Sequence, residues 1–235
     1  MKKKILGVIA LLGICVPMLA NAEEYKVDSD MSIDLDNESW YVFTRDNIKD
    51  NEELDELGLT YDYMDNLFNT NSLYLDASIF DTEEESFIEL LVRKKEIADV
   101  KNFSSYSNDE VLKFAKELSK RTGSTDYTVY EVNGYKFAYS KYLDKNVGYY
   151  VLEYCTMVNG FNYTITVQKP TEFTEEEETY IKSIIDTVKY NVKESEEKDE
   201  TSIADYAIVG AIAGATVALA CGVIAKKRKK VSNTK

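Results

Sequence analysis

Apolar side chains recur at every second position in several stretches of the chain, the pattern of strands that lay one face on a core. Residues 31–35 place Met31, Ile33 and Leu35 on one face, and residues 40–45 form an aromatic and β-branched run that opens with Trp40. The turn-forming residues DNES lie between them at positions 36–39. We therefore expect two strands here, with Trp40 as a core anchor at a sheet edge and not as a ligand-stacking residue.

A second alternating pair occupies residues 73–80 and 86–94, and an acidic loop joins its two halves. The alternation predicts a hairpin in which Glu89 and Arg93 point outward. The inward positions are Leu73, Leu75, Ala77, Ile79, Ile88, Leu90 and Val92.

Residues 127–168 contain two Asn-Gly dipeptides between β-rich runs, at positions 133–134 and 159–160. Asn-Gly is typical of two-residue type I′ turns, because both turn positions need a positive φ. These turns predict the pairing register, and residues 144–146 then join the two hairpins into a four-stranded meander. The expected pairs include Val132 with Tyr135, Tyr154 with Ile165 and, on the polar face, Cys155 with Thr164.

Two segments with helical spacing lie between the predicted strands. The sequence DNEE at 50–53 resembles a capping box, and Gly58 is positioned to end the helix that follows it. Thr60 is a predicted N-cap of a second helix that ends near Asn71. This helical pair is either an ordinary crossover or a lid over the sheet, and we favour the crossover.

Two longer helices are indicated further along the chain. Ser107 with Glu110 and Thr174 with Glu177 have the spacing of capping boxes. Apolar stripes follow both boxes, and Gly123 is placed to end the first helix. The stripe of the second helix consists of Ile181, Ile184, Ile185 and Val188.

The end of the chain carries an uncharged apolar stretch at 206–225, followed directly by a basic block. About 20 apolar residues are enough for a helix to cross a bilayer, and basic residues stay on the cytoplasmic side. We therefore predict a transmembrane helix with a basic cytoplasmic tail at 226–235. The residues expected to hold this topology are Lys226, Lys227, Arg228, Lys229 and Lys230.

Small residues recur every fourth position within this predicted span, at Gly210, Gly214, Ala218 and Gly222. Such spacing puts them on one helix face, where two helices could approach closely. A homodimer through the span is therefore one predicted association. The alternative is that Gly and Ala are simply common in membrane spans.

The first 22 residues have the features of a signal peptide: three lysines, an apolar core from Ile5 and the small-residue sequence Ala20-Asn21-Ala22. Residues 23–192 then form a domain outside the cell, and the charged residues 193–205 form a short stalk. This organisation predicts a single-pass protein of the cell membrane. Lipidation at Cys15 is a less favoured alternative, because the preceding Ile14 is not small.

The charge and the residue composition of the chain exclude several classes of function. The segment 23–205 holds all 42 acidic residues and 19 of the 28 basic ones, so its net charge is −23. Such a surface repels nucleic acid. The chain has no histidine, which removes histidine-based catalysis and zinc sites of the Cys/His type. We expect no catalytic residue, cofactor or metal site.

The nine tyrosines of 127–163 are assigned to sheet packing, with a tyrosine-lined recognition face as the alternative.

Two stretches resemble the PsbP-like α/β/α sandwich group, which includes the photosystem subunit PsbP and bacterial envelope proteins of the DcrB type. They are MSIDLDNESW at 31–40 and FNYTITVQKPTEFTEEEETYIKSIIDTVKY at 161–190. The family commonly has proline where Asp36 stands here. The resemblance implies an α+β fold with an antiparallel sheet and packed helices, and members that bind or assemble.

The combined expectation is a non-catalytic binding or assembly module, held at the outer face of the membrane by one C-terminal transmembrane helix. Its predicted partners are the lipid bilayer, another membrane protein or a second copy of the chain. Two alternatives stay open: a carboxylate-dependent hydrolase of the cell envelope, since paired acidic groups can cleave glycosides, and a structural subunit of a membrane complex.

Overall fold

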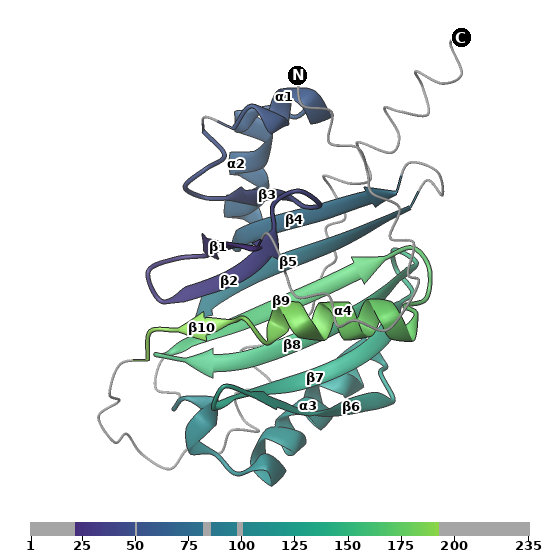
Figure 1. Cartoon of the computed structure of the whole chain (residues 1–235). Coiled ribbons are helices and arrows are strands. Elements are labelled where there is room, and N and C mark those ends of the chain that lie inside the picture. The colour runs from purple at the N-terminus through teal and green to yellow at the C-terminus, as the bar shows by residue number, and fades with distance from the viewer. Residues whose placement is uncertain (1–21, 50, 82–85, 98–100, 193–235) are drawn as a thin grey trace.

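The computed structural model of the protein describes residues 22–49, 51–81, 86–97 and 101–192 (Figure 1). Within these ranges no helix has the length and apolar character that crossing a membrane requires. The predicted span at 206–225, with its glycine stripe, lies outside the described residues, as do the stalk, the basic tail and all but the last residue of the predicted signal peptide.

The described chain is a mixed α+β structure built on one large antiparallel sheet. Seven strands lie side by side in the order β3-β4-β5-β9-β8-β7-β6, and every neighbouring pair is antiparallel. Their bounds are β3 Tyr41–Thr44, β4 Leu73–Asp81, β5 Ser86–Glu96, β6 Asp126–Val132, β7 Tyr135–Asp144, β8 Tyr149–Val158 and β9 Phe161–Lys169.

One face of this sheet is covered by a small sheet and by helix α4 (Glu175–Ile185), which lies across the front of the central strands in Figure 1. The small sheet has the order β1-β2-β10, with bounds β1 Ala22–Lys26, β2 Met31–Asp36 and β10 Lys189–Tyr190. The largest apolar core lies between these layers and includes Trp40, whose indole Nε1 donates to the Tyr180 hydroxyl at 2.9 Å. The alternation predicted for β2 is confirmed, since Met31, Ile33 and Leu35 are buried.

The other face carries the remaining helices at its two ends. Helices α1 (Glu53–Leu57) and α2 (Tyr61–Thr70) pack near β4, and α3 (Asn108–Thr122) packs on β6 and β7. A short 3-10 turn, η1 (Phe103–Ser105), precedes α3 and also contacts β7. Each end has its own apolar cluster. The segment containing α1 and α2 connects two adjacent antiparallel strands, β3 and β4, and its apolar residues cover their face of the sheet.

The register predicted for the meander is confirmed. Cys155 pairs with Thr164, Tyr154 with Ile165 and Val132 with Tyr135. Both turns have the positive φ values that a type I′ turn needs: 53° and 78° at 133–134, and 54° and 78° at 159–160. The Asn-Gly dipeptides therefore determine which side chains share each face of these four strands.

The described helix ends agree with the sequence in all but two cases, and one of these is α4, which ends at Ile185 and so leaves Val188 of the predicted stripe outside the helix. Ser107 and Thr174 make complete capping boxes with Glu110 and Glu177. Thr60 accepts from the Tyr63 amide, as expected of an N-cap. The capping box predicted at 50–53 is wrong, because Glu52 is the N-cap of α1 and its side chain makes no capping bond. Instead, the amide of Glu53 donates to the Asn51 side chain at 2.9 Å.

Two predictions for the β4–β5 hairpin are wrong: the face on which Leu73 lies and the exposure of Glu89 and Arg93. A shift of register between Leu73 and Leu75 places Leu73 in the cluster under α2, while Leu75 stays in the main core. Glu89 and Arg93 lie on the face opposite Leu90, as alternation requires, but they are 0% and 1% exposed. The second face of the sheet is therefore closed to solvent at these two positions, although both residues are charged.

Candidate functional site

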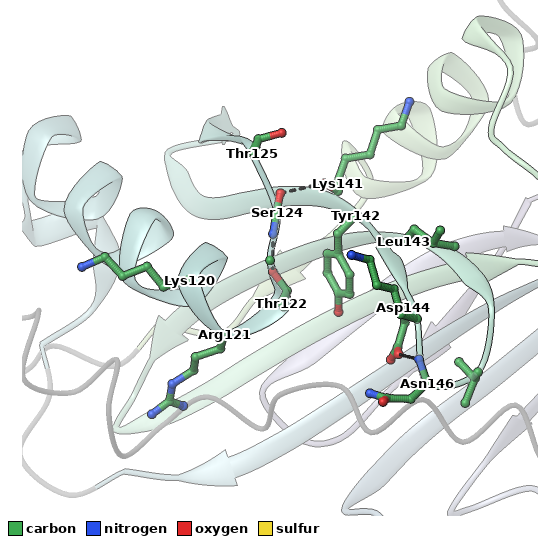
Figure 2. Close-up of a pocket in the computed structure, with 13 residues that line it drawn as sticks. Lys120, Arg121, Thr122, Ser124, Thr125, Lys141, Tyr142, Leu143, Asp144 and Asn146 are labelled. Carbon is green, nitrogen blue, oxygen red and sulfur yellow. Dashed lines mark hydrogen bonds between the residues drawn. The ribbon is translucent and has the colours of Figure 1, made fainter.

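A pocket with a volume of about 810 Å³ lies between the C-terminal end of α3 and the turn that joins β7 to β8 (Figure 2). One wall is the segment 120–125 and the other is the segment 141–147. Four of its lining residues are cations, Lys120, Arg121, Lys141 and Lys145, and Asp144 is the one carboxylate among them.

Local hydrogen bonds hold both walls in place. Gly123 ends α3 with a φ of 73°, a left-handed conformation that suits glycine. The Ser124 hydroxyl then lies 2.9 Å from the Asp126 carbonyl and 2.7 Å from the Lys141 carbonyl, so it links the end of α3 to β7. In the facing turn, the Asp144 carboxylate accepts from the Asn146 amide at 2.9 Å (Figure 2). The pocket is thus formed by ordered backbone on both sides.

Tyr142 connects the pocket to the interior of the protein. Its ring extends between the segment 122–125 and the turn at 144–146 in Figure 2, and its hydroxyl donates to Glu153 Oε2 at 3.2 Å. The residue is 8% exposed. Burial raises the pKa of the Tyr142 hydroxyl, and the nearby Glu153 carboxylate raises it further. Tyr142 therefore remains a neutral donor at the inner wall of the pocket.

Behind Tyr142 lies a group of buried polar residues on the same face of the sheet, here called the polar cluster: Asp76, Glu89, Arg93, Glu153 and Gln168. Gln168 Nε2 donates to Glu89 across β9 and β5, and Arg93 Nη1 donates to Thr166 Oγ1 at 3.3 Å. Arg93 acts electrostatically on all three carboxyl groups of the cluster. One guanidinium thus faces three carboxyl groups in a buried environment.

Burial shifts the pKa values of two carboxyl groups in the cluster. Burial raises the pKa of Asp76 to about 7, and the Ser78 hydroxyl and Arg93 act in the opposite direction. Burial likewise raises the pKa of Glu153 to about 7, against the effects of Tyr142 and Arg93. Both carboxyl groups therefore change protonation near neutral pH.

The arrangement limits what this region can do chemically. Within the described ranges, no group of three or more Asp, Glu or Cys side chains has the geometry to hold a metal ion. Asp76 and Glu153 do not line the pocket. Cys155 is 3% exposed, and burial raises the pKa of its thiol to about 12, so it is an inert core residue.

The residues singled out from the sequence as sites are Gly210, Gly214, Ala218, Gly222 and the basic block at 226–230, and all lie outside the described residues. Sequence reasoning missed the pocket and the polar cluster. Asp76, Glu89 and Glu153 each have an apolar or aromatic residue on both sides in the sequence, and that local setting is the signal that points to a buried charge. The tyrosines of the meander are buried or half-buried, as sheet packing requires.

No protein-family model and no curated protein matches the chain. Among solved structures, a cyanobacterial PsbP (CyanoP) from Synechocystis sp. PCC 6803 is 14% identical, with a TM-score of 0.40 over 79% of this chain and 98% of that one. A protein from Bacteroides thetaiotaomicron VPI-5482 is also 14% identical, with a TM-score of 0.38 over 75% of this chain. The chain spans about half of that protein, 51% of its length. A PsbP protein is thus among the structural neighbours, but at these TM-scores neither neighbour indicates what the chain binds.

Proposed function

We propose that this chain is a non-catalytic binding or assembly domain, tethered to the outer face of the cytoplasmic membrane and binding its partner through the pocket beside Tyr142. Its membrane location is predicted from the two ends of the sequence, and its binding site is the pocket described above.

The main support for this proposed function is the distance between the pocket and the point where the chain leaves the domain. Asn159 Nδ2 donates to the Asn191 carbonyl at 2.8 Å, so the end of the domain lies beside the turn between β8 and β9. The pocket lies at the opposite end of β8, and Figure 1 shows the β8 arrow pointing toward β10. A strand from Tyr149 to Val158 spans about 30 Å.

This placement turns the pocket away from the predicted membrane anchor. The predicted stalk, 193–205, would have a root-mean-square span of roughly 20 Å as a flexible chain. The domain therefore stays near the membrane. The pocket faces partners that approach from the side away from the membrane. A second copy could still associate through the predicted span, with its stripe of small residues.

The test is capture of a partner from native membranes by the full-length tagged protein. Val147 is 42% exposed at the pocket, and Val192 is 47% exposed at the other end of the domain. We expect Val147→Asp to abolish capture of a defined partner and Val192→Asp to leave it intact. Equal capture by the wild type and Val147→Asp would remove the pocket from the proposal, and capture of nothing by the wild type would contradict the proposal as a whole.

One observation favours the hydrolase alternative: Asp76 and Glu153 have pKa values raised to about 7, the range of a general acid. Both side chains are buried away from the pocket, which argues against access by a polymer. Steady hydrolysis of a cell-wall glycan by the full-length protein, lost in Glu153→Gln, would establish the enzyme and replace the binding proposal.

A further inference from the structure

We infer that the pocket binds an anionic group, a phosphate or a carboxylate, attached to a partly apolar ligand. This inference rests on the proposed function, because it names the chemistry of the ligand for the same pocket. It follows from the charge, the exposure and the order of the residues that line it.

The charge of the pocket is opposite to that of the protein. The chain has 28 basic and 42 acidic residues, yet the pocket is lined by four cations and one carboxylate. An acidic protein repels anions at long range, so an anionic ligand needs a local excess of positive charge in order to bind. This pocket supplies such an excess on two facing walls.

The cations of the pocket differ in the strength of the interactions that they already make within the protein. Lys141 bonds to Glu178 at 2.8 Å with both side chains about a fifth exposed, so it serves as part of the wall. Lys120 pairs with Glu117 on its own helix, but these side chains are 59% and 40% exposed, and such a pair contributes little. Lys145 is exposed at the turn, and no carboxylate in the described ranges lies within ion-pairing distance of it. Arg121 already has an interaction partner, so Lys145 and Lys120 are the cations available to a ligand.

The apolar part of the ligand follows from the neighbours of Lys145. Among the described residues, five large hydrophobic side chains are exposed, and two of them, Leu143 and Val147, line this pocket at 40% and 42% exposure. Exposed apolar side chains beside cations suit a ligand that carries both kinds of group. Because the walls are already ordered by Ser124 and Asp144, binding requires little further ordering of the backbone.

The test uses the full-length protein in nanodiscs of zwitterionic lipid, with fluorescent inorganic polyphosphate, polyglutamate and neutral dextran as probes. We expect at least one polyanion to bind in a salt-dependent manner and dextran not to bind. Lys145→Glu should weaken that binding roughly tenfold, the effect of losing and reversing one charged contact. Binding of polyphosphate alone or polyglutamate alone identifies the group as phosphate or carboxylate.

The matched control is Lys26→Glu, an equal charge change at an exposed lysine of β1, outside the pocket. We expect it to change the affinity by less than about twofold, since distant exposed charges are screened. Equal weakening by both variants would overturn the inference by showing attraction to the whole protein and not to the pocket. Binding of neither polyanion would also overturn it, and the proposed function would still stand if the membrane partner is captured through Val147.

Discussion

At the scale of single residues, the carboxyl groups of Asp76 and Glu153 make the stability of the protein depend on pH. Their ordinary pKa values are 3.8 and 4.5, and burial raises both to about 7. The folded state therefore holds protons that the unfolded state has released. Their stabilising contribution is fully present below the unfolded pKa values and is lost as the pH rises through about 7.

We predict that the protein is more stable at pH 5 than at pH 7.5, and that the double variant Asp76→Asn, Glu153→Gln flattens this dependence. Each proton released on unfolding accounts for about 1.4 kcal/mol per pH unit. The measurement is denaturant unfolding of both proteins across this range. The exposed control Glu176→Gln should follow the wild type. An unchanged slope in the double variant would assign the pH dependence to the general acidity of the chain.

The sequence predicts which face Glu89 and Arg93 occupy but not that they are buried. Strand alternation is local, and it places both residues opposite Leu90 correctly. Whether the second face is wet depends on what packs there, and a charged residue on a strand is normally read as a solvent-facing one. The same reasoning explains Cys155 and Thr164, which pair as predicted but are both 3% exposed.

At the scale of elements, an ion pair of Lys94 in β5 connects the large sheet to the loop between β1 and β2 of the small sheet. Its Nζ lies 2.6 Å from Asp28 Oδ2 and 3.9 Å from the centre of the Phe161 ring. Asp28 also accepts from the amides of Asp30 and Met31 and from the Tyr163 hydroxyl, so one carboxylate orders the loop that leads into β2. This ion pair is almost fully buried, at 9% and 10% side-chain exposure.

We predict that Lys94→Met lowers the free energy of unfolding by about 3 kcal/mol, because it leaves the Asp28 carboxylate buried without its cation. Methionine keeps most of the packing against Phe161, so the loss reports the charge. The double variant with Asp28→Asn should recover part of it. An exposed Lys113→Met is the control and should cost less than about 0.5 kcal/mol. Similar losses at Lys94 and Lys113 would contradict a special role for this pair.

The capping boxes of α3 and α4 are the elements that the sequence predicts most completely, since their signal is local to four residues. Thr174→Ala should destabilise the protein by about 1 kcal/mol, because the Glu177 amide loses its acceptor at the N-terminus of α4. Thr174→Ser keeps a hydroxyl and should restore most of the stability. Thermal unfolding measures both. Equal stability of the alanine variant and the wild type would show that tertiary packing alone holds this end of the helix.

At the scale of the whole molecule, the sequence indicates the strands and their turns but not the order of the sheet. The meander β6 to β9 follows from its turns, whereas the pairing of β5 with β9 joins segments about 70 residues apart with no turn between them. The two outer strands of the small sheet were also missed. β10 has two residues, and β1 alternates too little to stand out from a charged segment. Long-range pairing depends on packing of the finished layers, which local patterns do not report.

The separation of the pocket from the predicted anchor leads to a prediction for the protein in a membrane. If the chain continues from residue 192 into a short stalk and a span, the turn at Lys145 lies on average farther from the bilayer than Val192 does. The extra distance is up to the roughly 30 Å length of β8. The stalk allows the domain to tilt but adds only roughly 20 Å of reach.

Single fluorescent labels on Lys145→Cys and Val192→Cys, each with Cys221→Ser, should show this difference by energy transfer to a dye in the lipid of proteoliposomes. The buried Cys155 should remain unlabelled. We expect clearly weaker transfer from position 145 than from 192. Equal transfer from both would mean that the domain has no preferred orientation, and stronger transfer from 145 would mean that the pocket faces the bilayer, so that its anionic ligand would have to be a lipid headgroup.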